Sequence, residues 1–448
     1  MRGELVFQDS VSDSDRIDVF PERRKRFREA LDGGVAVLPS APVAVRSNDV
    51  DYVYRQDSDF YYLTGFAEPE SVAIFAPGHK DGEYVLFVRP RDKERETWTG
   101  RRAGVDGAIA EYGADKAYTV EELDGVLPRY LEGYERVYYP LGFNEKMNAR
   151  MVDLMRRFEA LRPRVDTAPV ALLDPRDIIH EMRLFKEPAE LELMRRAAAI
   201  SAQAHARAMR EARGGMREWA VEAMVDYTFR SQGAAGPAYP SIIASGPNAT
   251  ILHYVTNDRV LEHGELLMID AGCEYDYYAA DISRTFPVGS RFGQLQRELY
   301  QIVLDAQLNA IDSVKPGVRV DDVHETALRV LVEGMRAMKM LGGSADEIIA
   351  ARSYQRFYMH RTSHWLGMDV HDVGHYRKGG ESRRLEPGMV LTVEPGIYIS
   401  ADDETVPKEM RGIGIRIEDD ILVTPEGHEV LTAAAPKQIA EIEALTAP

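Results

Sequence analysis

The second part of the chain repeats one order of segments, in which two helical stretches are followed by two strand-like runs. Apolar residues follow helical spacing in the first pair and form short β-rich runs in the second pair. We expect helices over 189–213, 218–231, 293–313 and 320–341, and strands over 265–271, 278–288, 389–394 and 413–424. Because the sequence itself shows no repeat, the order of elements alone predicts an internal duplication.

The first part of the chain has a different order of segments. Short apolar runs with the composition of strands alternate there with helical patterns. The strands are expected at 35–38, 71–76 and 84–88, and the helices at 21–31, 119–133 and 145–160. We therefore predict an α/β N-terminal domain over residues 1–175 and a second domain over residues 176–448, which suits a chain of 448 residues.

Charge and composition exclude several classes of partner. The 55 basic and 73 acidic residues give a net charge of −18, which repels phosphate backbones and anionic lipids. We therefore expect neither nucleic acid nor membrane as a partner. The polar N-terminus and the absence of a long apolar run predict a cytoplasmic protein. Cys273 is the only cysteine, so the chain forms no intrachain disulfide and no thiolate metal cluster.

Two aspartates lie in apolar, strand-like runs, where aspartate is disfavoured. Asp270 ends the first run, Asp281 interrupts the second, and the polar-aromatic segment 274–277 lies between them. In a hairpin about this turn the two residues would face each other, with Cβ atoms about 5 Å apart. Opposed like charges destabilise a sheet, so this pair predicts a bound cation. For either residue taken singly, a protonated aspartate or a partner of Arg284 is the favoured interpretation.

Two later carboxylates repeat the pattern. Alternation through 413–418 places three isoleucines on one face of a strand and Gly414, Arg416 and Glu418 on the other, where Gly414 is expected to leave space beside the two charged residues. Arg416 and Glu418 are expected to project into one cavity, where an unpaired charge would be costly. Glu394 ends another apolar strand; alone it would be read as a surface glutamate.

Four of the eleven histidines lie between residues 360 and 375. Such a density favours metal binding or acid–base chemistry. The spacing is not that of a His-Glu-x-x-His zinc helix. His371 and His375 are four residues apart and could share a metal only within a helix, but Gly374 indicates a loop.

Together these residues predict a ligand set of four carboxylates and one histidine. Such hard donors suit manganese, iron, cobalt, zinc or magnesium rather than copper. Five ligands exceed one tetrahedral site, so two ions sharing carboxylates and a hydroxide are expected, an arrangement that hydrolyses amides or phosphoesters. The chain has no Walker loop and no Gly-x-Ser-x-Gly elbow.

The same residues carry a resemblance to a known family. In order and approximate spacing they resemble the dinuclear metallopeptidases with the pita-bread fold, and among these the bacterial Xaa-Pro aminopeptidases (aminopeptidase P). The resemblance covers residue 20 to the C-terminus and rests on Tyr54-Arg-Gln-Asp-Ser-Asp-Phe, Thr64-Gly-Phe, His180-Glu-Met-Arg-Leu-Phe-Lys, Ile251-Leu-His-Tyr, Ser363-His-Trp-Leu-Gly and Gly412-Ile-Gly-Ile-Arg-Ile-Glu. The segment His360-Arg-Thr-Ser departs from the expected His-Gly-Leu-Ser.

The resemblance implies a fold and a metal centre. The second domain would be a pita-bread domain, with pseudo-twofold helix-helix-hairpin halves around a curved antiparallel sheet. Two divalent ions would be bound, with manganese the first choice and zinc or cobalt the alternatives. The implied ligands are Asp270, Asp281, His364, Glu394 and Glu418, with Glu418 bridging the two ions.

The resemblance also implies an activity and the residues that perform it. A metal-bridging hydroxide would attack the carbonyl carbon of the residue before proline, and Glu394 would shuttle the proton. His371 would polarise the scissile carbonyl, and His253 would lie near the scissile nitrogen. His360 and Tyr398 would line the proline pocket. Arg416 would fix Glu418 and contact substrate.

Alternative functions stay open at this point. The nearest is prolidase, which cleaves Xaa-Pro dipeptides with the same ligands. A metal-free creatinase-like amidinohydrolase is disfavoured by the complete ligand set, and so is a non-catalytic module that binds proteins. The resemblance further implies a homo-oligomer, dimer or tetramer, in which Trp98 could reach a neighbouring active site. The expected substrates are peptides with proline at the second position.

Overall fold

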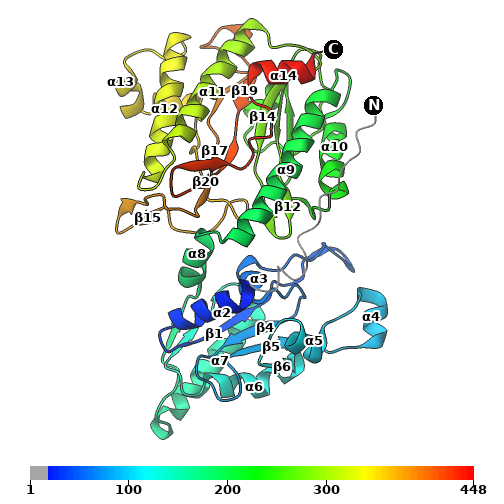
Figure 1. The fold of residues 1–448 in the computed structure, drawn as a ribbon, viewed down its shortest axis with the longest axis vertical. Coiled ribbons are helices and arrows are strands. Elements are labelled where there is room, and N and C mark those ends of the chain that lie inside the picture. The colour runs from blue at the N-terminus through cyan, green and yellow to red at the C-terminus, as the bar shows by residue number, and fades with distance from the viewer. Residues whose placement is uncertain (1–18, 448) are drawn as a thin grey trace. The chain divides into compact units, whose positions relative to one another are not determined.

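The computed structural model describes residues 19–447, and the chain divides into two compact units, Met1–Met182 and Arg183–Pro448 (Figure 1). The division falls inside α8 (Arg176–Leu184). The domain boundary expected from the sequence, between residues 175 and 176, lies at the start of this helix.

The N-terminal unit is built on a six-stranded mixed sheet of order β6-β5-β4-β1-β7-β8. Its strands are β1 (Val35–Pro39), β4 (Val72–Phe75), β5 (Tyr84–Val88), β6 (Lys116–Thr119), β7 (Arg136–Tyr138) and β8 (Ala171–Leu173); β2 (Val45–Ser47) and β3 (Val50–Asp51) form a separate hairpin. The helices are α2 (Val19–Ala30), α3 (Ser58–Thr64), α4 (Lys93–Thr99), α5 (Gly104–Ala110), α6 (Leu123–Leu131) and α7 (Glu145–Leu161).

Helices cover both faces of this sheet. Phe27 of α2 packs edge-on against Phe75 of β4, with ring centroids 5.1 Å apart. On the other face, Leu127 of α6 and Met151 of α7 join the apolar cluster of the inner strands. Burial on both faces explains why β1, β4 and β5 read as continuous apolar runs rather than alternating ones. The predicted α/β domain is therefore confirmed.

The C-terminal unit contains the repeated order of elements. The first half consists of α9 (Pro188–Glu211), α10 (Glu218–Ser231), β9 (Gly236–Pro237), β10 (Ile242–Ser245), β11 (Leu266–Asp270), β12 (Cys273–Tyr275), β13 (Tyr278–Ala279) and β14 (Ser283–Pro287). The second consists of α11 (Gln294–Ser313), α12 (Val320–Ala337), α13 (Ala345–Ala350), β15 (Arg377–Lys378), β16 (Glu381–Ser382), β17 (Val390–Val393), β18 (Gly396–Ile399), β19 (Ile413–Arg416), β20 (Asp419–Val423) and β21 (His428–Val430), and α14 (Ile439–Thr446) follows. Figure 1 shows the two helix pairs flanking the central strands.

The hairpin that carries the two aspartates has a different register from the predicted one. Its turn lies at Asp276 and Tyr277, both with positive φ, and β11 pairs with β14 so that Asp270 opposes Ser283. The prediction that Asp270 faces Asp281 is therefore wrong. At Gly272 a Cβ would lie 1.7 Å from Ala280 O, so the two backbones come too close there for a regular ladder. Asp281 consequently lies outside both strands.

The strand predicted over 413–424 is interrupted. Residues 417 and 418 separate β19, which pairs with β18, from β20, which pairs with β17. The predicted alternation holds along residues 413–417, since Ile415 and Ile417 belong to the main apolar cluster and Ile413 packs against it. Glu418 lies at the bend between the two strands.

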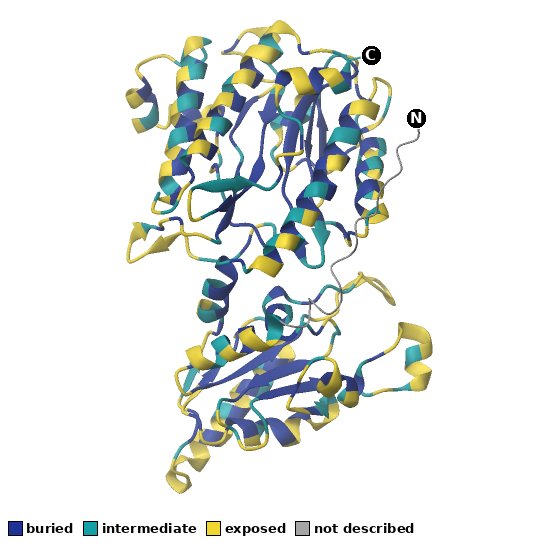
Figure 2. Ribbon diagram, viewed as in Figure 1, coloured by how far each residue is buried: buried dark blue, intermediate teal, exposed yellow. Residues whose placement is uncertain are grey.

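Burial follows the layers of the C-terminal unit. The central strands are buried along their length, while the helices expose one face and bury the other (Figure 2). Within residues 19–447, no helix is both long enough and apolar enough to cross a lipid bilayer.

Candidate metal centre and active site

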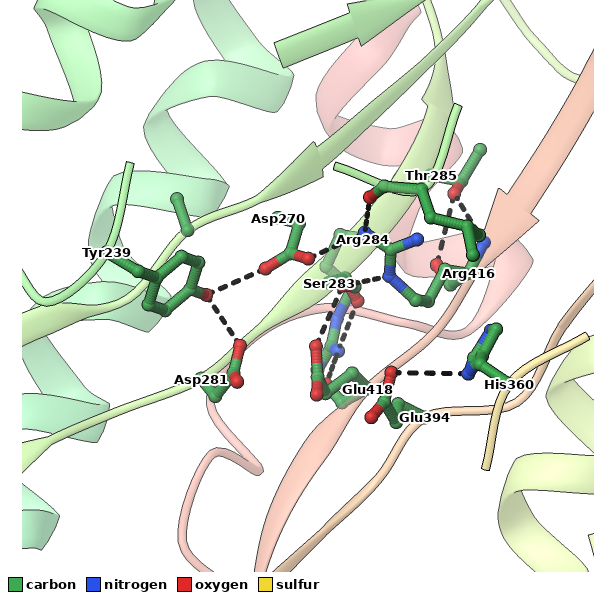
Figure 3. A network of polar contacts seen from close by, with 12 residues as sticks. Tyr239, Asp270, Asp281, Ser283, Arg284, Thr285, His360, Glu394, Arg416 and Glu418 are labelled. Carbon is green, nitrogen blue, oxygen red and sulfur yellow. Dashed lines mark hydrogen bonds and ion pairs between the residues drawn. The ribbon is translucent and has the colours of Figure 1, made fainter. Parts of the chain in front are cut away.

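Asp270 and Asp281 meet at a third side chain that sequence reasoning missed. The hydroxyl of Tyr239 lies 2.7 Å from Asp270 Oδ1 and 2.5 Å from Asp281 Oδ1 (Figure 3). A phenol has one hydrogen to donate, so it satisfies only one of these carboxylates. Tyr239 lies in the Gly/Pro-rich segment before β10, which carried no recognisable motif.

Arg416 connects Asp270 to the second half of the unit. Its Nη2 donates to Asp270 Oδ2 at 2.6 Å, and its Nε donates to Ser283 Oγ at 2.9 Å. Ser283 Oγ in turn donates to Glu418 Oε2 at 2.8 Å (Figure 3). Arg416 and Glu418 are both buried, so the prediction that they project into one cavity is confirmed.

His364 directs an electron pair at the carboxylates. Its Nδ1 lies 2.9 Å from the carbonyl oxygen of Trp365 and therefore donates to it. In the neutral ring the lone pair of Nε2 then points towards Asp281 Oδ2 at 3.4 Å and Glu394 Oε1 at 3.7 Å. Three electron-pair donors facing one another repel unless a cation lies among them.

Three of the five predicted ligands form a group that can hold a metal ion. Ligand atoms of Asp281, His364 and Glu418 all lie within 4.8 Å of one another. Asp270 adjoins this group through Tyr239, and Glu394 adjoins it through His364. A divalent cation fits this donor set of buried carboxylates and one imidazole, whose Nδ1 is held by a backbone carbonyl oxygen. The structure thus brings all five residues together.

The pKa values of the carboxyl groups reflect burial and the repulsion between acidic groups in the cluster. Burial, and then the charge of Asp270, raises the pKa of Asp281 well above its ordinary value. Burial, and then Asp281, has the same effect on the pKa of Glu418. Burial and Glu418 raise the pKa of Glu394 to about 8. Without a metal, the folded protein therefore favours protonated carboxyl groups in this cluster.

The predicted substrate residues adjoin the cluster. His360 Nδ1 donates to the carbonyl oxygen of Arg361 at 2.8 Å, so its Nε2 accepts from the hydroxyl of Tyr398 at 2.8 Å. Tyr398 in turn accepts from Arg416 Nη1 at 3.0 Å. Burial, and then Arg416, lowers the pKa of His360 to about 4, so this ring is neutral at physiological pH.

His371 and His253 lie nearer the solvent. The ring of His371 is 4.4 Å from that of His364, at an interplanar angle of 78°. Burial, and then the proximity of the second imidazole, His364, lowers the pKa of His371. Residues 371–375 form no helix, as Gly374 indicated, so His371 and His375 do not form a helical metal pair.

One cavity of about 1110 Å³ connects these residues. It is lined by every predicted ligand together with His253, His360, His371 and Arg416, and also by Tyr239. Tyr398 is buried behind its wall, against His360. The cavity can therefore admit a peptide to the carboxylates from the solvent side.

A buried polar network supports the ligands from behind. The backbone N–H of Asp281 donates to Asp420 Oδ2 at 3.1 Å. The neighbouring Asp419 is fully buried and accepts from Arg284 Nη2 and Lys437 Nζ, both at 2.7 Å. Arg284 therefore pairs with Asp419, so the alternative in which it neutralises Asp270 or Asp281 is wrong.

Comparisons with known proteins identify the family. Residues 192–425 match the model described as "Metallopeptidase family M24", and residues 20–138 match "Aminopeptidase P, N-terminal domain". The Xaa-Pro aminopeptidase of Escherichia coli (strain K12) is 44% identical over 95% of this chain and 97% of that protein. The human Xaa-Pro aminopeptidase 3 is 35% identical over 94% of this chain and 82% of that protein.

Solved structures agree. The aminopeptidase PepP of Pseudomonas aeruginosa superimposes with a TM-score of 0.92 at 50% identity, covering 96% of this chain and 98% of that one. A variant of the E. coli aminopeptidase P in complex with substrate also gives 0.92, at 44% identity over 96% and 97% of the two chains. The expected fold, an α/β domain followed by a pita-bread domain, is confirmed. The chain therefore belongs to metallopeptidase family M24 and carries the N-terminal domain of the aminopeptidase P type.

Proposed function

We propose that this protein is an Xaa-Pro aminopeptidase, which hydrolyses the bond between the N-terminal residue of a peptide and a following proline. The observation that carries this proposal is the convergence of Asp281, His364 and Glu418 on one point in a cavity open to solvent. Relatives of 44% and 42% identity that carry the name Xaa-Pro aminopeptidase support the same activity.

The proposed cofactor is a pair of divalent ions, with manganese first and zinc or cobalt as alternatives. The residues that would hold it are Asp270, Asp281, His364, Glu394 and Glu418. When bound, such ions lower the pKa of water and polarise a carbonyl group. One solved structure of the E. coli aminopeptidase P is described as zinc-substituted, which supports zinc as an alternative ion.

The remaining roles belong to side chains of the cavity. Glu394 is proposed to carry the proton from the attacking water to the leaving nitrogen, since this carboxylate lines the cavity beside His364 and the other proposed ligands. His371 and His253 are proposed to contact the scissile carbonyl and the peptide backbone. Arg416 is proposed to hold Asp270 and, through Ser283, Glu418 in place.

Specificity for proline requires a dedicated pocket. Proline has no N–H to donate, and its ring fixes the backbone, so a site must recognise its shape. His360 and Tyr398 are proposed to form this pocket. Their mutual hydrogen bond of 2.8 Å satisfies both polar groups, so His360, which lines the cavity, can present its ring to the pyrrolidine while Tyr398 holds it from behind.

Prolidase activity is the alternative that uses the same ligands. The two activities differ in whether a chain may follow the proline. We expect an Ala-Pro-Ala tripeptide to be cleaved with a higher kcat/KM than an Ala-Pro dipeptide. Preference for the dipeptide would contradict the proposal, and no hydrolysis of either would favour the non-catalytic module.

A chelation experiment tests the metal requirement. Activity on an Xaa-Pro-Xaa peptide should be lost after removal of metal and should return on titration with manganese, with zinc and cobalt run in parallel. Full activity in the metal-free protein would contradict the mechanism. The homo-oligomeric state, the cytoplasmic location and the contribution of Trp98, which is highly exposed on α4, remain predictions.

A further inference from the structure

Three charged side chains line the active-site cavity outside the carboxylate cluster. They are Asp321 in the first turn of α12, Arg361 directly after His360, and Arg377 at the start of β15. Arg361 Nη2 donates to Asp321 Oδ1, and Arg377 Nη1 lies 3.4 Å from Asp321 Oδ2. We call these residues the rim cluster.

The rim cluster is positively charged. Two guanidinium groups face one carboxylate, which leaves a net charge of +1 in a protein whose net charge is −18. The side chains of Arg361 and Arg377 are 60% and 62% exposed. A guanidinium group offers five N–H donors, so Arg361 keeps donors for a further acceptor beside its contact with Asp321. Arg377 does so as well, although its Nη2 also donates to the carbonyl oxygen of Gly380 at 2.8 Å. A carboxylate is the partner that matches this planar fork.

The position of Arg361 connects the rim to substrate. Its carbonyl oxygen accepts from the Nδ1 of His360, whose Nε2 contacts Tyr398. Arg361 therefore follows directly after the proposed proline pocket. An aminopeptidase removes one residue, so the chain beyond proline must leave the cavity, and an extended chain advances about 3.3 Å per residue. One or two residues after proline are thus sufficient to reach the rim.

We propose that the rim cluster binds a carboxylate in the part of the peptide that follows proline. This inference rests on the proposed function and adds a preference among its substrates. The carboxylate can come from an acidic side chain at the third or fourth position or from the C-terminus of a short peptide. Arg361 lies at the position where glycine is expected from the family motif. Its positive charge is therefore a feature of this chain and not of the motif.

Four peptides separate the two sources of the carboxylate. They are Ala-Pro-Ala-Ala amide, Ala-Pro-Asp-Ala amide, Ala-Pro-Lys-Ala amide, and Ala-Pro-Ala-Ala with a free C-terminus. At low salt we expect kcat/KM for the aspartate peptide to exceed that for the lysine peptide by about fivefold, the effect of one exposed ion pair. A free C-terminus that exceeds its amide by the same factor identifies the terminal carboxylate as a ligand. Both ratios should fall as ionic strength rises.

Variants test the assignment to these arginines. Arg361→Gln and Arg377→Gln should each lower the ratio of aspartate to lysine peptide towards one, and Arg361→Lys should restore part of it. Arg329→Gln is the matched control, because Arg329 is also exposed and paired with one aspartate, Asp346 at 3.1 Å, but does not line this cavity. The control should keep the wild-type ratio.

The outcomes distinguish the two proposals. Equal cleavage of all four peptides, or a ratio unchanged in both glutamine variants, overturns the rim proposal and leaves the aminopeptidase proposal standing. No cleavage of the neutral amide by the metal-loaded protein overturns the proposed function, and the rim proposal with it.

Discussion

At the scale of single residues, the site brings together acidic groups that repel one another in the absence of a cation. Burial and mutual repulsion raise the pKa of Asp281 and Glu418 well above their ordinary values. Arg416 is a buried cation beside these carboxylates, and it contacts Asp270 directly. The site is therefore suited to binding a cation, but its buried carboxylates lower the stability of the metal-free protein.

Substitution of one ligand separates these two effects. Asp281→Asn should lower metal affinity and kcat/KM by more than about a hundredfold. A hundredfold is the largest loss usually caused by replacing a residue that only supports a ligand, and Asp281 is proposed to be a ligand itself. The metal-free variant should be at least as stable as the metal-free wild type at pH 8, since one repelling carboxylate is gone. Metal analysis and thermal unfolding measure the two effects, with the exposed Asp402→Asn as control. A strongly destabilised metal-free variant would contradict this account.

Asp419 is a carboxylate of the opposite kind. Although burial raises its pKa, Arg284 and Lys437 outweigh this effect and hold the pKa at about 2, below its ordinary value of 3.8. Its stabilising contribution is therefore present above pH 3.8 and is lost as the pH falls towards 2. Asp419→Asn leaves Arg284 buried without its partner and should lower the free energy of unfolding at pH 7 by about 3–5 kcal/mol.

Denaturant unfolding at several pH values checks this expectation. The difference between wild type and Asp419→Asn should shrink between pH 4 and pH 2, whereas the exposed Glu426→Gln should differ little from wild type throughout. A difference that stays constant down to pH 2 would show that the ion pair is not its origin.

At the scale of elements, the site depends on close approach between backbones. The sequence suggested that Gly414 leaves space beside Arg416. The space is filled, because a Cβ at Gly414 would lie 2.0 Å from the carbonyl oxygen of Ala249 in the 3₁₀ helix Gly246–Thr250. The segment that follows this helix carries His253.

Glu218 holds the same segment from its other side. This buried carboxylate at the start of α10 accepts from the hydroxyl of Tyr254 at 2.7 Å, the backbone N–H of Arg259 at 2.9 Å and that of Ser245 at 2.7 Å. It thereby connects residues on both sides of His253. Contacts with β19 and with α10 together determine where His253 lies.

Gly414→Ala tests the contact with β19. The added methyl group should displace the Ala249 backbone and lower the free energy of unfolding by about 2–3 kcal/mol. It should also lower kcat/KM, because the His253 segment moves with Ala249. Gly427→Ala is the control, since a Cβ at Gly427 meets no atom within 4 Å and should change neither quantity. Equal stability of the two variants in denaturant titrations would contradict the close contact.

At the scale of the whole molecule, metal binding and protonation are linked to folding. The pKa of Glu394, about 8 in the folded protein, exceeds its ordinary value of 4.5, so the folded state binds more protons between these values. The stability of the metal-free protein should therefore fall as the pH rises from about 4.5 to about 8. Asp281 and Glu418 act in the same direction.

Divalent ions should reverse this trend. Because the ligands bind metal in their deprotonated form, added manganese should raise Tm more at pH 8 than at pH 5.5. Calorimetry of the metal-free and metal-loaded protein at the two pH values measures both effects. A metal-free protein that is more stable at pH 8 than at pH 5.5 would contradict the shifted pKa values.

Sequence reasoning succeeded where periodicity and local composition decide the structure. The helices predicted at 189–213 and 293–313 occur as α9 and α11, with ends within a few residues of those expected. The helix predicted over 320–341 ends earlier, because the chain leaves the helix at Met338 and takes a positive φ at Lys339. The spacing of apolar residues along the sequence does not indicate where the backbone leaves the helix in this way.

The candidate site was recognised from unusual residue types rather than from geometry. Aspartate and glutamate in apolar strands stand out in any sequence, and all five predicted ligands lie together in the structure. The route by which Asp270 and Asp281 meet was predicted incorrectly. Their contact passes through Tyr239, whose side chain has no exceptional feature in the sequence.

Residue type and short-range period were enough to predict the classes of the two domains, the longer helices, several of the buried strands and the acidic cluster. The register at Gly272, the partner of Arg284 and the filled space at Gly414 follow only from the folded structure. Each of these depends on the approach of segments far apart in the chain, to within a fraction of an ångström. Packing at that precision selects among arrangements that share the same hydrophobic pattern.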